Sequence, residues 1–241
     1  MRTREGARSV GTSCLSGSMA LLFCIVLAYP VVGVAVDTDA IIDMMEAAYA
    51  NVADYQIKVE IRSFGEDGLS QIEKFLYSFK KPLRIRLDFE SPRPGMIMIY
   101  PDENGKVIVK HSGFLGLMTF HLSPDNRLLR ISSGQRIDQT DMGLLIRNIA
   151  RSLGDGRRGP AVTSEEHGYV QIQVAAADHF RPGIVTLYRF LIDKKTWLPT
   201  KVEESKPDGR QERIVTFENL ELNKGIPDGF FREDARAGGV K

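Results

Sequence analysis

The fold is decided by residues 55–89, YQIKVEIRSFGEDGLSQIEKFLYSFKKPLRIRLDF. Apolar and polar side chains alternate there with a period of two, which is typical of strands with one buried face. The alternation occurs in three runs, at 55–61, 75–79 and 83–89, and a glycine-bearing turn at 65–68 separates the first two. Three strands joined by short turns predict an antiparallel meander.

The same alternation predicts which side chains face the core. We expect a concave, buried side that carries Ile57, Val59, Ile85 and Leu87. The charged residues between them should point outward: Lys58, Glu60, Arg84 and Arg86. A slip of one residue would turn every charge inward, so the apolar face fixes this register.

One helix is predicted before the meander and further strands after it. Residues 38–52 carry apolar side chains at helical spacing behind candidate N-caps at 37–39. The strands MIMIY (96–100) and KVIVKH (106–111) flank Asn104-Gly105, a strong hairpin signal. Residues 112–137 mix Gly, Ser and Pro with large apolar side chains, and we expect a mobile loop and two short strands there.

A second helix should begin at Thr140 or Asp141, either of which can cap it. One side of this helix is apolar and consists of Leu144, Leu145, Ile149 and Leu153. The run LGDGRRGP at 153–160 ends it. Apolar and polar residues then alternate at 169–174, and further strands are expected at 184–193, 197–205 and 213–223. The total of about ten strands is near the upper size of an open sheet.

The N-terminus has the layout of a signal peptide. Three arginines, Arg2, Arg4 and Arg8, precede an uncharged run at 19–36. Gly33 and Ala35 are small residues suited to cleavage after Ala35, which makes 1–35 the leader. The alternative is an uncleaved membrane anchor, because 18 apolar residues are near the minimum that spans a bilayer.

Cleavage would leave about 206 residues, enough for one domain at 36–232 with a flexible tail at 233–241. Both cysteines, Cys14 and Cys24, lie in the leader, so the mature chain would have no disulfide. The formal charge changes from +1 to −1, because the leader contains three arginines and one glutamate. This balance does not favour nucleic acid as a partner.

No pattern of residues predicts catalysis or a cofactor. Gly154, Gly156 and Gly159 spell GxGxxG, but they follow a helix and run into Pro160, whereas a phosphate loop must follow a strand and open a helix. We therefore interpret this segment as a helix stop and linker.

The titratable residues do not form a recognisable site either. The four histidines lack metal-ligand spacing: His111, His121, His167 and His179. The pairs Glu165-Glu166 and Glu203-Glu204 are adjacent in sequence, and neighbours on a strand face opposite sides, so neither pair forms an acid/base dyad. We expect no enzyme, no metal and no cofactor.

Large, adaptable apolar side chains occur at the helices, in the sheet and in the irregular segment. They are Met44, Met45, Met96, Met98, Met118 and Met142, with Phe114, Leu115 and Leu117. Methionine adapts to ligands of variable shape, and the segment from Phe114 to Leu122 is too apolar for a solvent loop. An apolar ligand cavity is the prediction, and an ordinary core is the alternative.

Three stretches together resemble the outer-membrane lipoprotein carrier and acceptor (LolA/LolB-like) superfamily. They are FLYSFKKPLRIRLDFESPRPGMIMIY, TDMGLLIRNIARSL and FLIDKKTWLPTKVEESKPDGRQERIVTFENLELNKGIPDGFF. The part from PDENGKVIVKHSGFLG to GLLIRNIARSL is more similar to an uncharacterised LolA-like domain family. The resemblance implies an open antiparallel half-barrel, mainly β (α+β), whose helices cover a concave face and whose cavity takes acyl chains.

The resemblance also assigns residues. The ligand-binding cavity and lid would consist of Ile57, Val59, Ile61, Phe75, Tyr77, Ile85, Leu87, Met96, Met98, Phe114, Leu117, Met142, Leu144, Leu145 and Ile149. Lys81, which precedes Pro82, takes the place of an arginine that hydrogen-bonds the lid in the carriers. Lysine lacks the planar fork of arginine, which weakens such a latch.

The function that follows is a periplasmic carrier that shields lipoprotein acyl chains or another amphiphile in outer-membrane lipoprotein sorting. Its partners would be the lipid, an inner-membrane donor protein and an outer-membrane acceptor protein. An acyl chain must be shielded because each CH₂ exposed to water costs about 0.8 kcal/mol. The alternative is an envelope sensor or structural module that detects lipoproteins with the same fold and signals to a protein partner.

Overall fold

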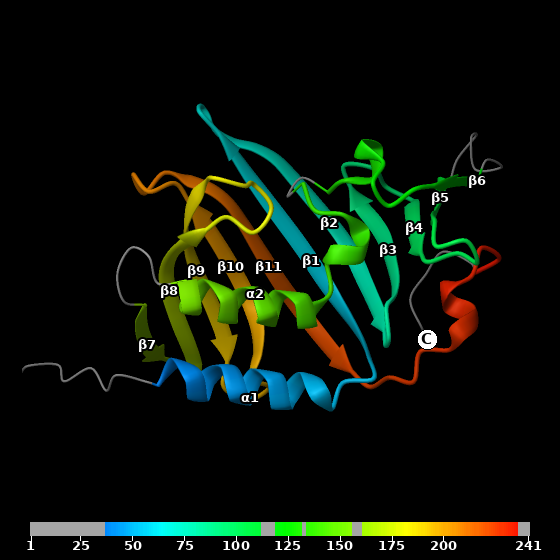
Figure 1. Cartoon of the computed structure of the whole chain (residues 1–241). Helices are drawn as coiled ribbons and strands as arrows, with labels where there is room; N and C mark the ends of the chain where they lie inside the picture. The colour runs from blue at the N-terminus through cyan, green and yellow to red at the C-terminus, as the bar shows by residue number, and fades with distance from the viewer. Residues whose placement is uncertain (1–36, 112–118, 132–133, 156–160, 236–241) are drawn as a thin grey trace, which may run out of the picture. The chain divides into compact units, whose positions relative to one another are not determined.

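The described strands form one antiparallel sheet in the order β6-β5-β4-β3-β2-β1-β11-β10-β9-β8-β7 (Figure 1). The computed structural model describes residues 37–111, 119–131, 134–155 and 161–235. The strands are β1 (Asp54–Gly65), β2 (Gly68–Lys80), β3 (Arg84–Ser91), β4 (Met96–Tyr100), β5 (Val107–His111), β6 (Thr119–Leu122), β7 (Val162–Glu166), β8 (Tyr169–Ala177), β9 (Val185–Asp193), β10 (Leu198–Ser205) and β11 (Gln211–Leu222). This arrangement confirms the predicted mainly β fold with an open antiparallel sheet.

The first and last strands lie at the centre of the sheet. β1 pairs with β2 on one side and with β11 on the other, so the two halves of the chain extend in opposite directions from this pair (Figure 1). The outermost strands, β6 and β7, do not pair with each other in the described part of the chain. The sheet is therefore not closed.

Two helices cover one face of the sheet. They are α1 (Thr38–Ala50) and α2 (Met142–Asp155); in Figure 1, α2 crosses in front of the strands and α1 runs along their lower ends. The helices contact each other, α2 contacts β8, and α1 contacts β10. The arrangement confirms the predicted helices over the concave face.

Local sequence explains where the helices begin. The carboxylate of Asp37 accepts a hydrogen bond from the backbone N–H of Asp39 at the start of α1. Asp141 does the same for α2, because its Oδ1 accepts from the N–H of Leu144 at 3.0 Å. Ile146 and Ile149 are buried under α2, whereas Arg147 is exposed, as an amphipathic helix requires.

The predicted register is confirmed on the buried side of the meander. Ile57, Val59, Ile85 and Leu87 are all buried in the main core. Lys58 is exposed on the other side. The register follows from pairing, since Ile57 faces Tyr77 on β2 and Tyr77 faces Leu87 on β3.

The expectation that Arg86 points into solvent is wrong. Arg86 does lie on the outer face, but it is 0% exposed, because the short helix η3 (Asp228–Phe231) packs over it. A second apolar cluster surrounds this contact and consists of Ile97, Ile99, Ile108, Ile226 and Phe231. The sheet is thus buried on both faces at β3–β5.

The irregular segment differs in detail from the prediction. Two strands were expected within 112–137, but the described residues there contain one strand, β6. They also contain the 3-10 helix η1 (Arg127–Leu129) and the first residue of a second one, η2 (Ile137–Gln139). Strand β7 was not predicted, because VTSEE has too little apolar character to indicate a strand. It forms by pairing with β8.

Several predicted features lie outside the described residues. These are the leader at 1–35, the end of the tail at 236–241, and residues 156–160 of the glycine-rich run. In the described ranges, no helix combines the length and the apolar character needed to cross a membrane.

Candidate functional site

A cavity of about 90 Å³ lies between the concave face of the sheet, α2 and the segment that leads into α2. Its lining residues are Tyr55, Ile57, Val59, Ile61, Phe75, Tyr77, Leu87, Ile131, Gln135, Gln139, Thr140, Asp141, Met142, Leu145, Asn148, His179, Phe180, Tyr188, Phe190, Val202, Glu204, Val215 and Phe217. Thirteen of these 23 residues are apolar, three are tyrosines and seven are other polar or titratable residues, so the lining combines an apolar majority with groups that can orient a ligand.

The floor of the cavity is a line of four apolar side chains on four neighbouring strands. We call these four residues the apolar row. Ile61 on β1 faces Val215 on β11, Val215 faces Val202 on β10, and Val202 faces Phe190 on β9. Cross-strand neighbours project from the same face of a sheet, so these four side chains form one continuous surface. A hydrocarbon chain would contact it along its length.

The roof is α2, which places three residues above the floor. Met142, Leu145 and Asn148 are spaced by three positions and therefore lie along one stripe of the helix. Leu145 is only partly buried, whereas Ile149 on the neighbouring stripe is fully buried in the core. One side of α2 thus forms core and the adjoining stripe forms cavity wall.

Tyrosine hydroxyls hold the N-terminus of α2 to the sheet and to α1. The Tyr55 hydroxyl accepts a hydrogen bond from the backbone N–H of Met142 at 3.1 Å. The Tyr77 hydroxyl lies 3.2 Å from Oγ1 of Thr140. Tyr49 on α1 donates to Oδ1 of Asp141 at 3.3 Å. These bonds satisfy polar groups at the end of the helix that would otherwise be buried unpaired.

The tyrosines are neutral at physiological pH. Burial raises the pKa of Tyr55 well above its usual value of 10.0, and it raises the pKa of Tyr77 in the same direction. Desolvation disfavours the phenolate, so both hydroxyls keep their protons and can act as hydrogen-bonding groups.

A polar row lies next to the apolar row, one step along the same four strands. Ser63 on β1 faces Arg213 on β11, Arg213 faces Glu204 on β10, and Glu204 faces Tyr188 on β9. The Arg213 guanidinium donates to the Glu204 carboxylate, and both residues are buried. His179, from the β8–β9 connection, packs against the Tyr188 ring with 4.9 Å between ring centroids.

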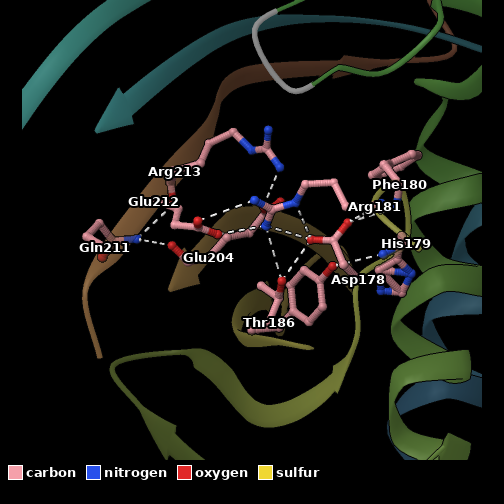
Figure 2. Close-up of polar contacts among 10 residues, drawn as sticks. Asp178, His179, Phe180, Arg181, Thr186, Glu204, Gln211, Glu212 and Arg213 are labelled. Carbon is pink, nitrogen blue, oxygen red and sulfur yellow. Dashed lines mark hydrogen bonds and ion pairs between the residues drawn. The ribbon is translucent and has the colours of Figure 1, made fainter. Parts of the chain in front are cut away.

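Figure 2 shows this end of the cavity, where a second network adjoins the polar row. Asp178 accepts hydrogen bonds from the guanidinium of Arg181, from the backbone N–H of Phe180 and from the Thr186 hydroxyl. Arg181 also donates to Glu212 at 2.7 Å. The network fixes the turn from β8 to β9, and with it the position of His179.

Burial changes the ionisation of the groups that face the cavity. Desolvation raises the pKa of Glu204, and the charge and hydrogen bond of Arg213 oppose that change only in part. Desolvation also lowers the pKa of His179, so its imidazole is neutral at pH 7. Burial alone would raise the pKa of Asp178, but hydrogen bonds from Arg181, Phe180 and Thr186 hold it below the usual 3.8.

The structure brings many of the residues predicted for the cavity and lid together. Those that line the cavity are Ile57, Val59, Ile61, Phe75, Tyr77, Leu87, Met142 and Leu145. Ile85, Met96, Met98 and Ile149 are instead buried in the main core. Leu144 is partly buried and is not among the lining residues. Phe114 and Leu117 lie outside the described residues.

Lys81 contacts α1 rather than the predicted lid helix α2. Its Nζ donates to the carbonyl oxygens of Tyr49 at 2.9 Å and Ala50 at 3.1 Å, and it lies 4.7 Å from the centroid of the Tyr49 ring. The end of β2 places Lys81 beside the last carbonyls of α1, where a cation is favourable. The link to α2 is indirect, through the Tyr49 hydroxyl.

The cavity residues from the second half of the chain were missed. They are His179, Phe180, Tyr188, Phe190, Val202, Glu204, Val215 and Phe217. The alternation in 188–192 and 202–204 placed several of them on one face of a strand. The missing information was the pairing of β11 with β1, which joins the two halves of the floor.

The other three histidines do not line the cavity. His111 ends β5, His121 lies in β6 and His167 occupies the β7–β8 turn. His121 Nδ1 lies 2.7 Å from Oδ2 of Asp102. In the described ranges, no three His, Cys, Asp or Glu side chains are grouped closely enough to hold a metal ion.

Neither the protein-family profiles nor the curated proteins contain a match to this chain. Several solved structures are similar to this chain. A putative outer membrane lipoprotein-sorting protein domain from Vibrio parahaemolyticus is 11% identical, with a TM-score of 0.40, over 82% of this chain and 98% of that one. A LolA superfamily protein from Nitrosomonas europaea is 14% identical, with a TM-score of 0.39, over 83% and 99%.

A third solved structure is the MucA/MucB complex of Pseudomonas aeruginosa. The matched chain is 13% identical, with a TM-score of 0.41, over 80% of this chain and 60% of that one. All three of these solved structures are at most 14% identical to this chain.

Proposed function

We propose that this protein binds the hydrocarbon part of an amphiphile in the cavity between α2 and the sheet and carries it through the cell envelope. The ligand would be the acyl chains of a lipoprotein or another lipid, and the protein would not alter it chemically. The observation that carries the proposal is the apolar row under a helix that forms core with one side and cavity wall with the other.

In this proposal α2 acts as a lid, because the cavity is too small to hold an acyl chain as it stands. Sites for drug-sized ligands have volumes of about 300–1,000 Å³, whereas this cavity has about 90 Å³. An acyl chain therefore fits only after α2 and the segment before it move away from the floor. The hydrogen bonds of Tyr55, Tyr77 and Tyr49 at the N-terminus of α2 are the polar contacts that such a movement would break.

A lid of this kind can exchange its ligand without a source of energy. An open and a closed state that differ by a few kcal/mol are both populated, and a ligand shifts the balance by its preference for one of them. Burial of each CH₂ contributes about 0.8 kcal/mol, so a long chain compensates for the broken contacts. The ligand would leave when an acceptor offers it an equally apolar site.

Binding is tested with N-phenyl-1-naphthylamine, an uncharged apolar dye that fluoresces in apolar surroundings. The full chain is expressed with its leader, purified from the periplasm and stripped of lipid. We expect saturable dye binding and displacement by single-chain amphiphiles. Absence of saturable binding by a folded protein would overturn the proposal.

The same preparation tests the leader and the carrier role. N-terminal sequencing should give a chain that begins at Val36, and lipid extraction followed by mass spectrometry should find a bound amphiphile. A chain that keeps residues 1–35 and remains with the inner membrane would contradict a diffusing carrier and support the anchored sensor.

A further inference from the structure

The polar row defined above interrupts an otherwise apolar face. Ser63, Arg213 and Glu204 continue the inward alternation that places Ile61, Val215 and Val202 in the apolar row. Glu204, Tyr188 and His179 line the cavity, and Arg213 and Ser63 extend the row beyond it. The concave surface is therefore amphiphilic, with a hydrocarbon-like part beside a hydrogen-bonding part.

This row contains polar atoms that the protein itself leaves without a partner. Four buried side-chain polar atoms in the described residues lack a hydrogen bond. Two of them, Ser63 Oγ and Arg213 Nε, lie in the row, and a third is Nδ1 of His179, whose ring packs on Tyr188 at the end of the row. An unpaired buried polar atom is costly, so native proteins contain few of them. Three such atoms along one row at the end of a cavity point to a partner that comes from outside the chain.

The bonding of His179 shows which kind of partner its ring needs. The Ser152 hydroxyl donates to the carbonyl oxygen of Asn148 at 3.0 Å, so its oxygen can only accept from Nε2 of His179, 2.9 Å away. Nε2 therefore carries the proton of the neutral ring, and Nδ1 is an acceptor. Arg213 Nε is a hydrogen-bond donor, and Ser63 Oγ can either donate or accept a hydrogen bond.

The charges of the region disfavour an anion. The carboxylates of Asp178, Glu204 and Glu212 face the guanidiniums of Arg181 and Arg213, each of which is already engaged with a carboxylate. Arg151 on α2 is exposed, and its Nη1 lies 3.4 Å from Oδ1 of Asn148. A carboxylate or phosphate placed here would meet an excess of negative charge in a poorly solvated site.

We propose that the polar row and His179 form the head-group end of the cavity, and that they bind an uncharged head group with both hydrogen-bond donors and acceptors, such as hydroxyl or amide groups. The hydrocarbon chain of the same amphiphile lies on the apolar row. This inference rests on the proposed function and adds the class of ligand: a neutral amphiphile, not a fatty-acid anion.

The test compares two ligands with the same chain. Monolauroylglycerol and laurate each displace N-phenyl-1-naphthylamine from the full exported chain at pH 8, where laurate is ionised. We expect monolauroylglycerol to bind at least about tenfold more tightly, which corresponds to one well-made buried hydrogen bond. Equal displacement, or tighter binding of laurate, overturns this inference and leaves the proposed function intact. Failure of the dye itself to bind overturns the proposed function.

A double variant locates the preference in the row. Glu204→Leu/Arg213→Leu removes both members of the buried pair, a change that folded proteins tolerate because no lone charge remains. We expect it to lose the preference for monolauroylglycerol, with both affinities calculated from the dye affinity measured for the variant itself. The control is Glu203→Leu/Arg189→Leu, which removes the 2.9 Å ion pair between β10 and β9 on the opposite face of the sheet and should keep the preference.

His179→Phe is a milder variant that keeps the ring but removes the acceptor. It should reduce the ratio of the monolauroylglycerol affinity to the laurate affinity, both calculated from the dye affinity of the variant itself. If neither this variant nor the double variant changes the ratio of the two affinities, the head group does not bind at the polar row, and the inference is wrong.

Discussion

The guanidinium of Arg86 stacks on the ring of Phe230, with 4.3 Å between its central carbon and the ring centroid. The same guanidinium donates twice to Asp88, at 2.8 and 2.9 Å, and once to the carbonyl oxygen of Phe230 at 3.0 Å. These contacts join the third strand to the C-terminal turn over the outer face of the sheet. The charge is buried completely, yet it is paired and hydrogen-bonded, as burial requires.

The variant Arg86→Lys should destabilise the protein by about 2–3 kcal/mol, because an ammonium cannot form the two parallel bonds to Asp88 or stack on Phe230 in the same way. The measurement is chemical denaturation. Arg84→Lys is the control, since Arg84 lies two residues earlier on the same face and its side chain is 40% exposed. It should change stability by less than about 0.5 kcal/mol. Equal effects would show that the stacking contributes nothing.

A charge on the cavity stripe of α2 should act on binding rather than on folding. Leu145→Glu places a carboxylate at the cavity wall, where it reaches water when the lid opens, and we expect dye affinity to fall at least about tenfold with the sheet intact. Ile149→Glu buries the same charge in the core and should cost about 3–5 kcal/mol. Thermal unfolding and dye titration of both variants decide between a lid and an ordinary core helix, because a core helix would give two similar losses of stability.

The hydroxyl of Tyr55 should control how readily the lid opens. Tyr55→Phe leaves the N–H of Met142 without its acceptor, which should cost about 1–3 kcal/mol and favour the open state. Dye association, followed by stopped-flow fluorescence, should become faster than in the parent protein. Tyr169→Phe removes an exposed hydroxyl from β8 and should leave the rate unchanged. A slower or unchanged rate in Tyr55→Phe would contradict a role in closing the lid.

Acid should weaken the β8–β9 turn through Asp178. Its pKa in the folded protein lies below the unfolded value near 3.8, so its stabilising effect is complete above that value and is lost as the pH falls through the folded pKa. Asp178→Asn should therefore be less stable than the parent at pH 7 by about 1–3 kcal/mol. The difference should shrink towards pH 3 in denaturation measured at both pH values. Asp43→Asn, at an exposed position in α1, is the control. A difference that stays constant with pH would rule out this linkage.

The parts of the fold that depend on neighbouring residues were predictable. The alternation in 55–61 fixed the inward face of β1, and Asp141 fixed the start of α2 by a bond to a residue three positions away. Both features depend on residues that are only a few positions apart in the chain, so the sequence alone is enough to predict them. Met96 and Met98 were predicted to line the cavity and lie in the core instead, because whether a buried side chain faces core or cavity depends on what lies opposite.

The parts that depend on distant contacts were not predictable. Glu204 reaches the cavity because β10 lies next to β11 in the sheet. β11 in turn pairs with β1, which is more than a hundred residues earlier in the chain. Arg86 is buried only because residues 228–231 return over it. No local pattern distinguishes Glu204 from its exposed-face neighbour Glu203, or Arg86 from Arg84. Three-dimensional pairing alone assigns them opposite environments.

If the proposed function holds, the unclosed sheet would let the protein bind ligands of different width. In a closed barrel, the number of strands and their shear fix the radius, and widening it means breaking a ladder of backbone hydrogen bonds. Here β6 and β7 are separate ends, so the curvature between them can relax through small changes in twist at every strand pair, with all ladders kept. The width of the cavity then depends on the twist of the whole sheet, so the cavity can adopt a range of volumes.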